Sequence, residues 1–130
     1  MKGDPLWVSC VIGGINKKTH EVFLGSTDLH GLKVEGNYIV TGLGMAYCQV
    51  LLENRWRADM SYEEAVALIE DCMRVLFFRD KKAHDQIMIS TVTHEHGVRL
   101  GKPYRIEASS DLQAFYDRNN EFYRPMRIRY

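Results

Sequence analysis

One pair of histidines has the spacing of a metal site. His94 and His96 lie two residues apart, so on a strand both side chains would point to the same side and could chelate zinc. A third ligand would have to come from His84, Glu95 or His30, and no Cys-x-x-Cys or His-Glu-x-x-His motif stands nearby. We interpret the pair as the polar tip of a hairpin and predict neither a metal nor a cofactor.

Cysteine offers a second kind of chemistry, in which Cys48 or Cys10 would attack a substrate beside a histidine. A reactive thiol needs an electropositive and partly open site. Cys48 instead stands among Tyr47, Val50 and Leu51, on the apolar side of an expected helix. The three cysteines are odd in number and widely spaced, which does not fit a disulfide framework. We predict buried core thiols in a reducing compartment.

A pair of glycines in the segment TGLG (Thr41–Gly44) opens a helix, where backbone amides could bind an anion. The segment lacks the third glycine of a dinucleotide-binding loop and the Lys-Ser/Thr of a P-loop. We therefore interpret it as a tight turn between a strand and a helix.

The C-terminal tail interleaves arginines with aromatic side chains. This composition suits a protein interface and also single-stranded nucleic acid. The chain as a whole is not basic, because 17 Lys and Arg residues balance 17 Asp and Glu residues. We therefore favour the interface, expect no nucleic acid, and keep a small nucleic-acid or protein-binding module as the alternative. The predicted contact residues are Phe115, Tyr116, Phe122, Tyr123, Arg124, Arg127, Arg129 and Tyr130.

These side chains belong to a chain of 130 residues, of which 45% are hydrophobic and 26% are charged. That length allows one modest domain or part of a larger one, and the composition is globular. The formal net charge of zero creates no field that would steer the chain to an anionic membrane. The first residues, MKGDPLW, lack the apolar run of a secretory signal. We expect a cytoplasmic and nuclear protein without membrane contact.

Strands are predicted to form the first third of the chain. Leu6–Ile15 and His20–Thr27 should pair as a hairpin, and Leu32–Gly42 should form a third extended region. Both faces of the first region are apolar, so the sheet should be covered on both sides. A helical period then runs from Met45 to Trp56.

The second helix has a clear start signal, because Ser61 and Glu64 can form a capping box. Its expected apolar stripe consists of Ala65, Ile69, Cys72, Met73 and Leu76. Strands return after this helix and turn back at Glu95–Gly97. The predicted elements are strands, then two helices, then strands. A single layer cannot bury both a sheet face and an apolar helix stripe, so we expect at least one layer of helices to pack on a sheet. The chain has too few predicted elements to cover the sheet on both sides, so we expect it to form about half of a layered sandwich.

Three segments together resemble the second half of a proteasome β-type subunit. They read FLGSTDLHGLKVEGNYIVTGLGMAYCQVLLE, MSYEEAVALIEDCMRVLFFRD and QIMISTVTHEHGV. The shared pattern includes Gly-x-Gly before a helix, MSxEEA opening the next helix and an aspartate closing it. PLWVSCVIGG and CMRVLFFRD are most similar to the non-catalytic type-4 subunits, at the seventh β position of the eukaryotic 20S core. We predict that residues 1–112 are the C-terminal half of such a domain and that residues 113–130 are an extension or interface arm.

The resemblance implies an α+β fold, the αββα sandwich of N-terminal-nucleophile hydrolases, present here in part. In active members an N-terminal threonine attacks the peptide, whereas this sequence begins with Met1. Active members also carry serines at the Gly-x-Gly helix opening and after the helix-closing aspartate. Leu43 and Met45 stand in the first neighbourhood and Ala83 in the second, while Asp80 is retained.

The resemblance therefore implies no catalytic residue in this chain, although the complex that such subunits build is a threonine-type endopeptidase. It implies α- and β-type proteasome subunits as partners. We predict a structural subunit that contributes to β-ring assembly and to ubiquitin-dependent protein degradation. An active peptidase is the third alternative, and it would need an exposed N-terminal nucleophile.

Overall fold

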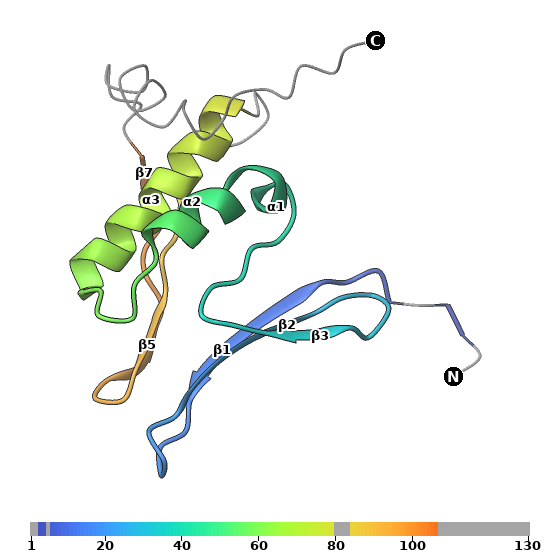
Figure 1. The fold of residues 1–130 in the computed structure, drawn as a ribbon, viewed down its shortest axis with the longest axis vertical. Coiled ribbons are helices and arrows are strands. Elements are labelled where there is room, and N and C mark those ends of the chain that lie inside the picture. Colours follow the sequence, from blue (N-terminus) through green and yellow to red (C-terminus); the bar gives the residue numbers. More distant parts are fainter. Residues whose placement is uncertain (1–2, 5, 80–83, 107–130) are drawn as a thin grey trace. The chain divides into compact units, whose positions relative to one another are not determined.

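The computed structural model describes residues 3–4, 6–79 and 84–106 (Figure 1). The described residues within Met1–Met45 and Met88–Pro103 form one compact unit, and those within Ala46–Ile87 and Tyr104–Tyr130 form a second. The boundary predicted after residue 112 lies outside the described residues, so it stays a prediction.

A three-stranded antiparallel sheet, in the order β1-β2-β3, dominates the first unit. β1 (Cys10–Ile15) pairs along its length with β2 (Val22–Thr27), which confirms the predicted hairpin. β3 (Lys33–Glu35) pairs with the other edge of β2. The predicted strands were too long: the first two began before β1 and β2 begin, and the third ran on past the end of β3. β1 begins at Cys10 because its partner there, Thr27, is the last residue of β2.

Two polar turns connect these strands. The Asn16 side-chain oxygen accepts hydrogen bonds from the backbone N–H of Lys18, at 2.9 Å, and of Thr19, at 3.3 Å. The Asp28 carboxylate likewise accepts from the His30 N–H at 2.9 Å. Such side-chain bonds to the following backbone stabilise tight turns, and they fix where each strand ends.

Both faces of this sheet are apolar, and both are exposed. Paired residues share a face and alternate along each strand, so one face carries Val11, Val22 and Val34. The other face carries Ile12 and Phe23. All five side chains are exposed, Val22 to 76%. The sequence predicted apolar faces that need cover, and the described residues of this unit do not supply it.

The first unit also contains a second hairpin, made of β5 (Thr91–Thr93) and β6 (Gly97–Arg99). Gly97 has a positive φ of 64°, which glycine adopts without a steric cost. His94 and His96 therefore lie in the turn and not on a strand. The predicted hairpin tip is confirmed, whereas the expectation that both imidazoles would face one way on a strand is wrong.

The second unit packs helices with short strands. α2 (Gln49–Arg55) and α3 (Tyr62–Arg79) lie against each other (Figure 1). β4 (Gln86–Ile87) pairs with β7 (Tyr104–Arg105) in an antiparallel ladder. The first predicted helix is interrupted: α1 (Gly44–Tyr47) ends before Cys48, and α2 follows it.

The buried hydrophobic core of the described residues lies in the second unit. Its members are Cys48, Leu51, Leu68, Cys72, Val75, Ile87 and Ile106. From α3 the core takes Leu68, Cys72 and Val75, which follow the i, i+4, i+7 pattern of one helix face. Cys72 was predicted correctly. Ile69 is 43% exposed whereas Leu68 is 3% exposed, so the buried face of α3 is turned from Ile69 towards Leu68 and Val75.

The capping box at the start of α3 is confirmed. The Ser61 hydroxyl accepts a hydrogen bond from the Glu64 N–H at 3.2 Å, and the Glu64 carboxylate accepts from the Ser61 N–H at 2.8 Å. Arg57 Nη2 also contacts Glu64, at 3.0 Å. The bond from Ser61 and the nearby Arg57 guanidinium lower the pKa of Glu64. The two residues therefore fix the first turn of α3.

Replacing the cap should weaken α3 measurably. We expect Ser61→Ala to lower the free energy of unfolding by about 1 kcal/mol, because it removes an acceptor for an otherwise unpaired helical N–H. Urea denaturation followed by circular dichroism measures the change. Ser61→Asp is the matched control, since aspartate is also a good cap. An equal loss in both variants would contradict a capping role for the side chain.

Candidate functional site

The opening of α1 carries exposed apolar side chains. Leu43 is 57% exposed and Met45 is 61% exposed, and the buried Gly44 lies between them. The positive φ of 61° at Gly42 makes a turn directly before α1, although β3 ends at Glu35 and residues 36–41 are not a strand. The predicted tight turn is therefore present. Neither Leu43 nor Met45 has a polar atom that could hold or transfer a proton.

The sequence-predicted positions Asp80 and Ala83 lie outside the described residues, so the expectation for that neighbourhood stays a prediction. The same holds for the predicted interface residues of the tail, from Phe115 to Tyr130.

Two cysteines form a buried contact within the second unit. The Cys48 thiol donates a hydrogen bond to the Cys72 carbonyl oxygen at 3.4 Å. The side-chain hydrogen bond with Cys48 and burial raise the pKa of the Cys72 thiol well above its usual value. A protonated, enclosed thiol is a poor nucleophile. The prediction that these cysteines are core residues is confirmed for Cys48 and Cys72, while Cys10 is half-buried.

A chain of charged hydrogen bonds connects α2, α3 and β7 beside this core. The Asp71 carboxylate bridges Arg55 Nη1, at 2.6 Å, and Arg74 Nη1, at 2.8 Å. Arg74 Nη2 also donates to Glu70 at 3.1 Å, and the Tyr104 hydroxyl donates to Glu70 at 2.7 Å. Each carboxylate is thus held by cations or by a hydroxyl donor, which suits a structural brace better than general acid or base catalysis.

Tyr104 gives this brace a measurable pH dependence. Loss of hydration and the hydrogen bond to Glu70 raise the pKa of Tyr104 to about 12. The protonated Tyr104 hydroxyl therefore contributes fully to the free energy of unfolding below the ordinary tyrosine pKa of 10.0. This contribution is lost as the pH rises to about 12. Ultraviolet titration of the folded chain should show a late tyrosine ionisation, and Tyr104→Phe should remove it. Removal of that step by Tyr62→Phe instead would contradict the assignment.

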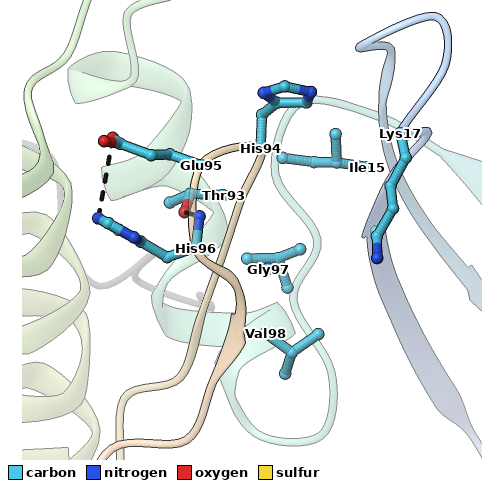
Figure 2. A pocket seen from close by; sticks show the side chains of 10 residues that line it. Ile15, Lys17, Thr93, His94, Glu95, His96, Gly97 and Val98 are labelled. Atoms are coloured by element: carbon cyan, nitrogen blue, oxygen red, sulfur yellow. Dashed lines mark hydrogen bonds and ion pairs between the residues drawn. The ribbon is translucent and has the colours of Figure 1, made fainter.

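The tip of the β5–β6 hairpin carries three neighbouring ionisable residues, His94, Glu95 and His96. The rings of His94 and His20 stack with centroids 3.6 Å apart. His96 Nε2 lies 3.8 Å from a carboxylate oxygen of Glu95 (Figure 2). Among residues 3–4, 6–79 and 84–106, no group of three or more histidine, cysteine, aspartate or glutamate side chains could hold a metal ion.

A cavity of about 530 Å³ opens beside this tip, between the end of β1 and the β5–β6 hairpin. Figure 2 shows Lys17 on one side of it and the Glu95–His96 pair on the other. The sequence pointed to His94 and His96 but missed the stacking partner His20 and the approach of Lys17. These residues lie more than seventy positions from the hairpin in sequence, and no local pattern links them.

The helices of the described residues include none that is long and apolar enough to cross a membrane.

Comparison with known proteins gives a consistent result. The family model described as "Proteasome subunit" matches residues 2–92. The "Proteasome subunit beta type-4" of Arabidopsis thaliana is 34% identical over 116 residues, covering 89% of this chain and 46% of the relative. The protein of the same name from Xenopus laevis is 39% identical over 115 residues, covering 85% of this chain and 46% of the relative.

A "Probable proteasome subunit beta type-7" from Encephalitozoon cuniculi is 31% identical over 122 residues, covering 85% of this chain and 54% of the relative. The chain thus spans about half the length of the curated relatives that it matches.

Proposed function

The chain belongs to the proteasome subunit family, among the relatives of its β-type members, and we propose that it is a non-catalytic structural subunit of the 20S core. In this role it helps to complete the β-ring, contacts α- and β-type subunits, and serves ubiquitin-dependent protein degradation in the cytoplasm and nucleus. The αββα sandwich is the architecture that we propose for the completed domain.

The exposed apolar sheet of the first unit carries this proposal. Val11, Val22 and Val34 are exposed on one face of β1–β3, and Ile12 is exposed on the other face. Contiguous apolar patches on a protein surface mark places where another protein binds. Burial of these side chains against neighbouring polypeptide would supply about 25 cal/mol for each Å² removed from water. A subunit that is completed by its partners fits this pattern.

Among the described residues, the side chains at the candidate catalytic positions support a structural role. At the α1 opening, where the resemblance places serines in active members, Leu43 and Met45 carry only apolar side chains. Cys48 and Cys72 are enclosed in the core. The Glu70 and Asp71 carboxylates are held by arginines.

Native mass spectrometry tests the proposal. The chain should associate when mixed with α- and β-type subunits and appear in a ring-sized complex. Val22→Asp should reduce incorporation, because it places a charge on the exposed apolar face. Asn37→Asp adds the same charge at an exposed polar position and should leave incorporation unchanged. A stable monomer that never associates would count against the proposal.

A peptidase assay distinguishes the structural subunit that we propose from an active peptidase. The isolated chain should not cleave fluorogenic peptides. Cleavage that a threonine-directed inhibitor blocks would replace the structural proposal with an enzymatic one.

A further inference from the structure

Two cysteines of the second unit meet where the start of α2 lies against α3. Cys48 is 2% exposed and Cys72 is 6% exposed, and 24 positions separate them in sequence. The Cys48 thiol donates to the Cys72 carbonyl oxygen at 3.4 Å, and a side-chain hydrogen bond also links the two thiols. Both residues belong to one compact unit, so the contact lies inside that unit.

Thiols in direct contact on two packed segments are placed to be joined covalently. A disulfide requires two side chains that approach each other from neighbouring backbones, and the Cys48 sulfur already lies beside the backbone of Cys72. Joining them would leave no carbonyl group without a donor. Cys72 lies inside α3, where its carbonyl oxygen also accepts the helical N–H of the residue four positions later.

The two thiols differ in how readily they ionise. The hydrogen bond with the Cys72 side chain lowers the pKa of the Cys48 thiol. The same contact and burial raise the pKa of the Cys72 thiol. Cys48 is therefore the sulfur that attacks an oxidant, since the thiolate is the nucleophilic form. Cys72 keeps its proton until an oxidised sulfur stands beside it.

The backbone at Cys48 gives a small oxidant a route to the enclosed pair. Cys48 stands at the break between α1, which has four residues, and α2, and no side-chain hydrogen bond caps α2 there. So short a helix gains little from its own hydrogen bonds, and the first N–H groups of α2 lack helical partners. Local opening at such a point costs less than global unfolding. Cys48 can thus be uncovered while α3 stays folded.

We propose that Cys48 and Cys72 form a disulfide when a small hydroperoxide oxidises the chain, and that this bond ties the junction of α1 and α2 to α3. The proposal goes beyond the role in the 20S core, because it concerns a covalent modification inside the second unit and requires no other ring subunit.

The reaction proceeds in two steps. The Cys48 thiolate attacks one peroxide oxygen, the O–O bond breaks, and the leaving hydroxide combines with the thiol proton to give water. The Cys72 sulfur then attacks the Cys48 sulfenic acid: the S–S bond forms, the S–O bond breaks, and the leaving hydroxide takes the Cys72 proton. The two thiols together lose two electrons, and the peroxide is reduced to water.

Peptide mapping of the full chain after treatment with hydrogen peroxide tests the bond. Trypsin cleaves at Arg55, between the two cysteines. Without reductant, the peptides that carry Cys48 and Cys72 should appear joined, with the mass of two hydrogen atoms lost, and reductant should separate them. Cys10, half-buried in the first unit, is an internal competitor. A predominant link from Cys10, a link between two chains, or sulfinic acids without a link would each overturn the proposal.

Stability measurements supply a second readout. Oxidation should raise the urea midpoint of the chain, because the bond constrains the unfolded state, and amide exchange in α2 should slow by about tenfold or more. Cys48→Ser is the matched control, since serine keeps a donor for the Cys72 carbonyl oxygen and forms no disulfide. Its midpoint should not rise on oxidation. An equal rise in this variant, or an unchanged midpoint in the cross-linked chain, would contradict the proposal that the bond ties these segments together.

Discussion

Leu68→Ala should lower the free energy of unfolding by about 2–5 kcal/mol, the range for truncating a large aliphatic side chain in a packed core. Leu68 is 3% exposed, on the face of α3 that also carries Cys72 and Val75. The described core contains few other large side chains, so few neighbouring groups can move into the cavity that the truncation leaves. Chemical denaturation followed by the helical circular dichroism signal measures the loss.

The adjacent residue provides the control for this prediction. Ile69 is similar to Leu68 in size but is 43% exposed, so Ile69→Ala should cost less than about 1 kcal/mol in the isolated chain. A larger loss for Ile69→Ala than for Leu68→Ala would show that the core faces the side predicted from the sequence. In a mixture with ring subunits, the same Ile69→Ala variant tests whether the exposed side of α3 contributes to assembly.

The rotation of the α3 stripe shows why the sequence located this helix but not its buried face. Ala65, Ile69, Cys72 and Leu76 form one stripe at helical spacing, and Leu68, Cys72 and Val75 form another that overlaps it. Both satisfy the helical period. Only the position of the neighbouring elements distinguishes them, and that information is not local to the helix.

Local signals were sufficient elsewhere in the fold. The side chains of Asn16 and Asp28 form the turns that their types favour, and Ser61 caps α3 with Glu64 as its spacing predicts. The ends of the strands were harder to predict from the sequence, because the length of β1 depends on where its partner β2 ends. A strand boundary is a property of the pair.

The cavity at the hairpin tip shows the same division between local and distant information. The turn residues Glu95–Gly97 identified the hairpin tip, because a turn and its flanking strands are contiguous in sequence. Lys17 and His20 reach that tip only through the fold. Charge composition could not reveal the cavity either, since a net charge of zero conceals where each charge lies.

Gly101→Ala should destabilise the first unit by about 1–3 kcal/mol, the usual cost of forcing an extra carbon into a filled space. A Cβ atom at Gly101 would overlap the carbonyl oxygen of Ile89 and would lie 3.0 Å from its carbonyl carbon. Both atoms belong to the backbone, so relief requires the chain on one side to move. Amide hydrogen exchange across β5 and β6 should accelerate, while exchange in α3 should change little.

A glycine in the same unit separates this steric effect from a general preference for glycine. A Cβ atom at Gly13 would meet only the Leu24 Cδ1 atom, at 3.7 Å, an ordinary van der Waals distance. Gly13→Ala should therefore change the stability by less than about 0.5 kcal/mol. If both variants were equally tolerated, the close approach of residues 89 and 101 would not exist in solution. The segment that leads from β6 towards β7 would then be free to shift relative to the residues before β5, and the β5–β6 hairpin would lose one of the contacts that hold it in place.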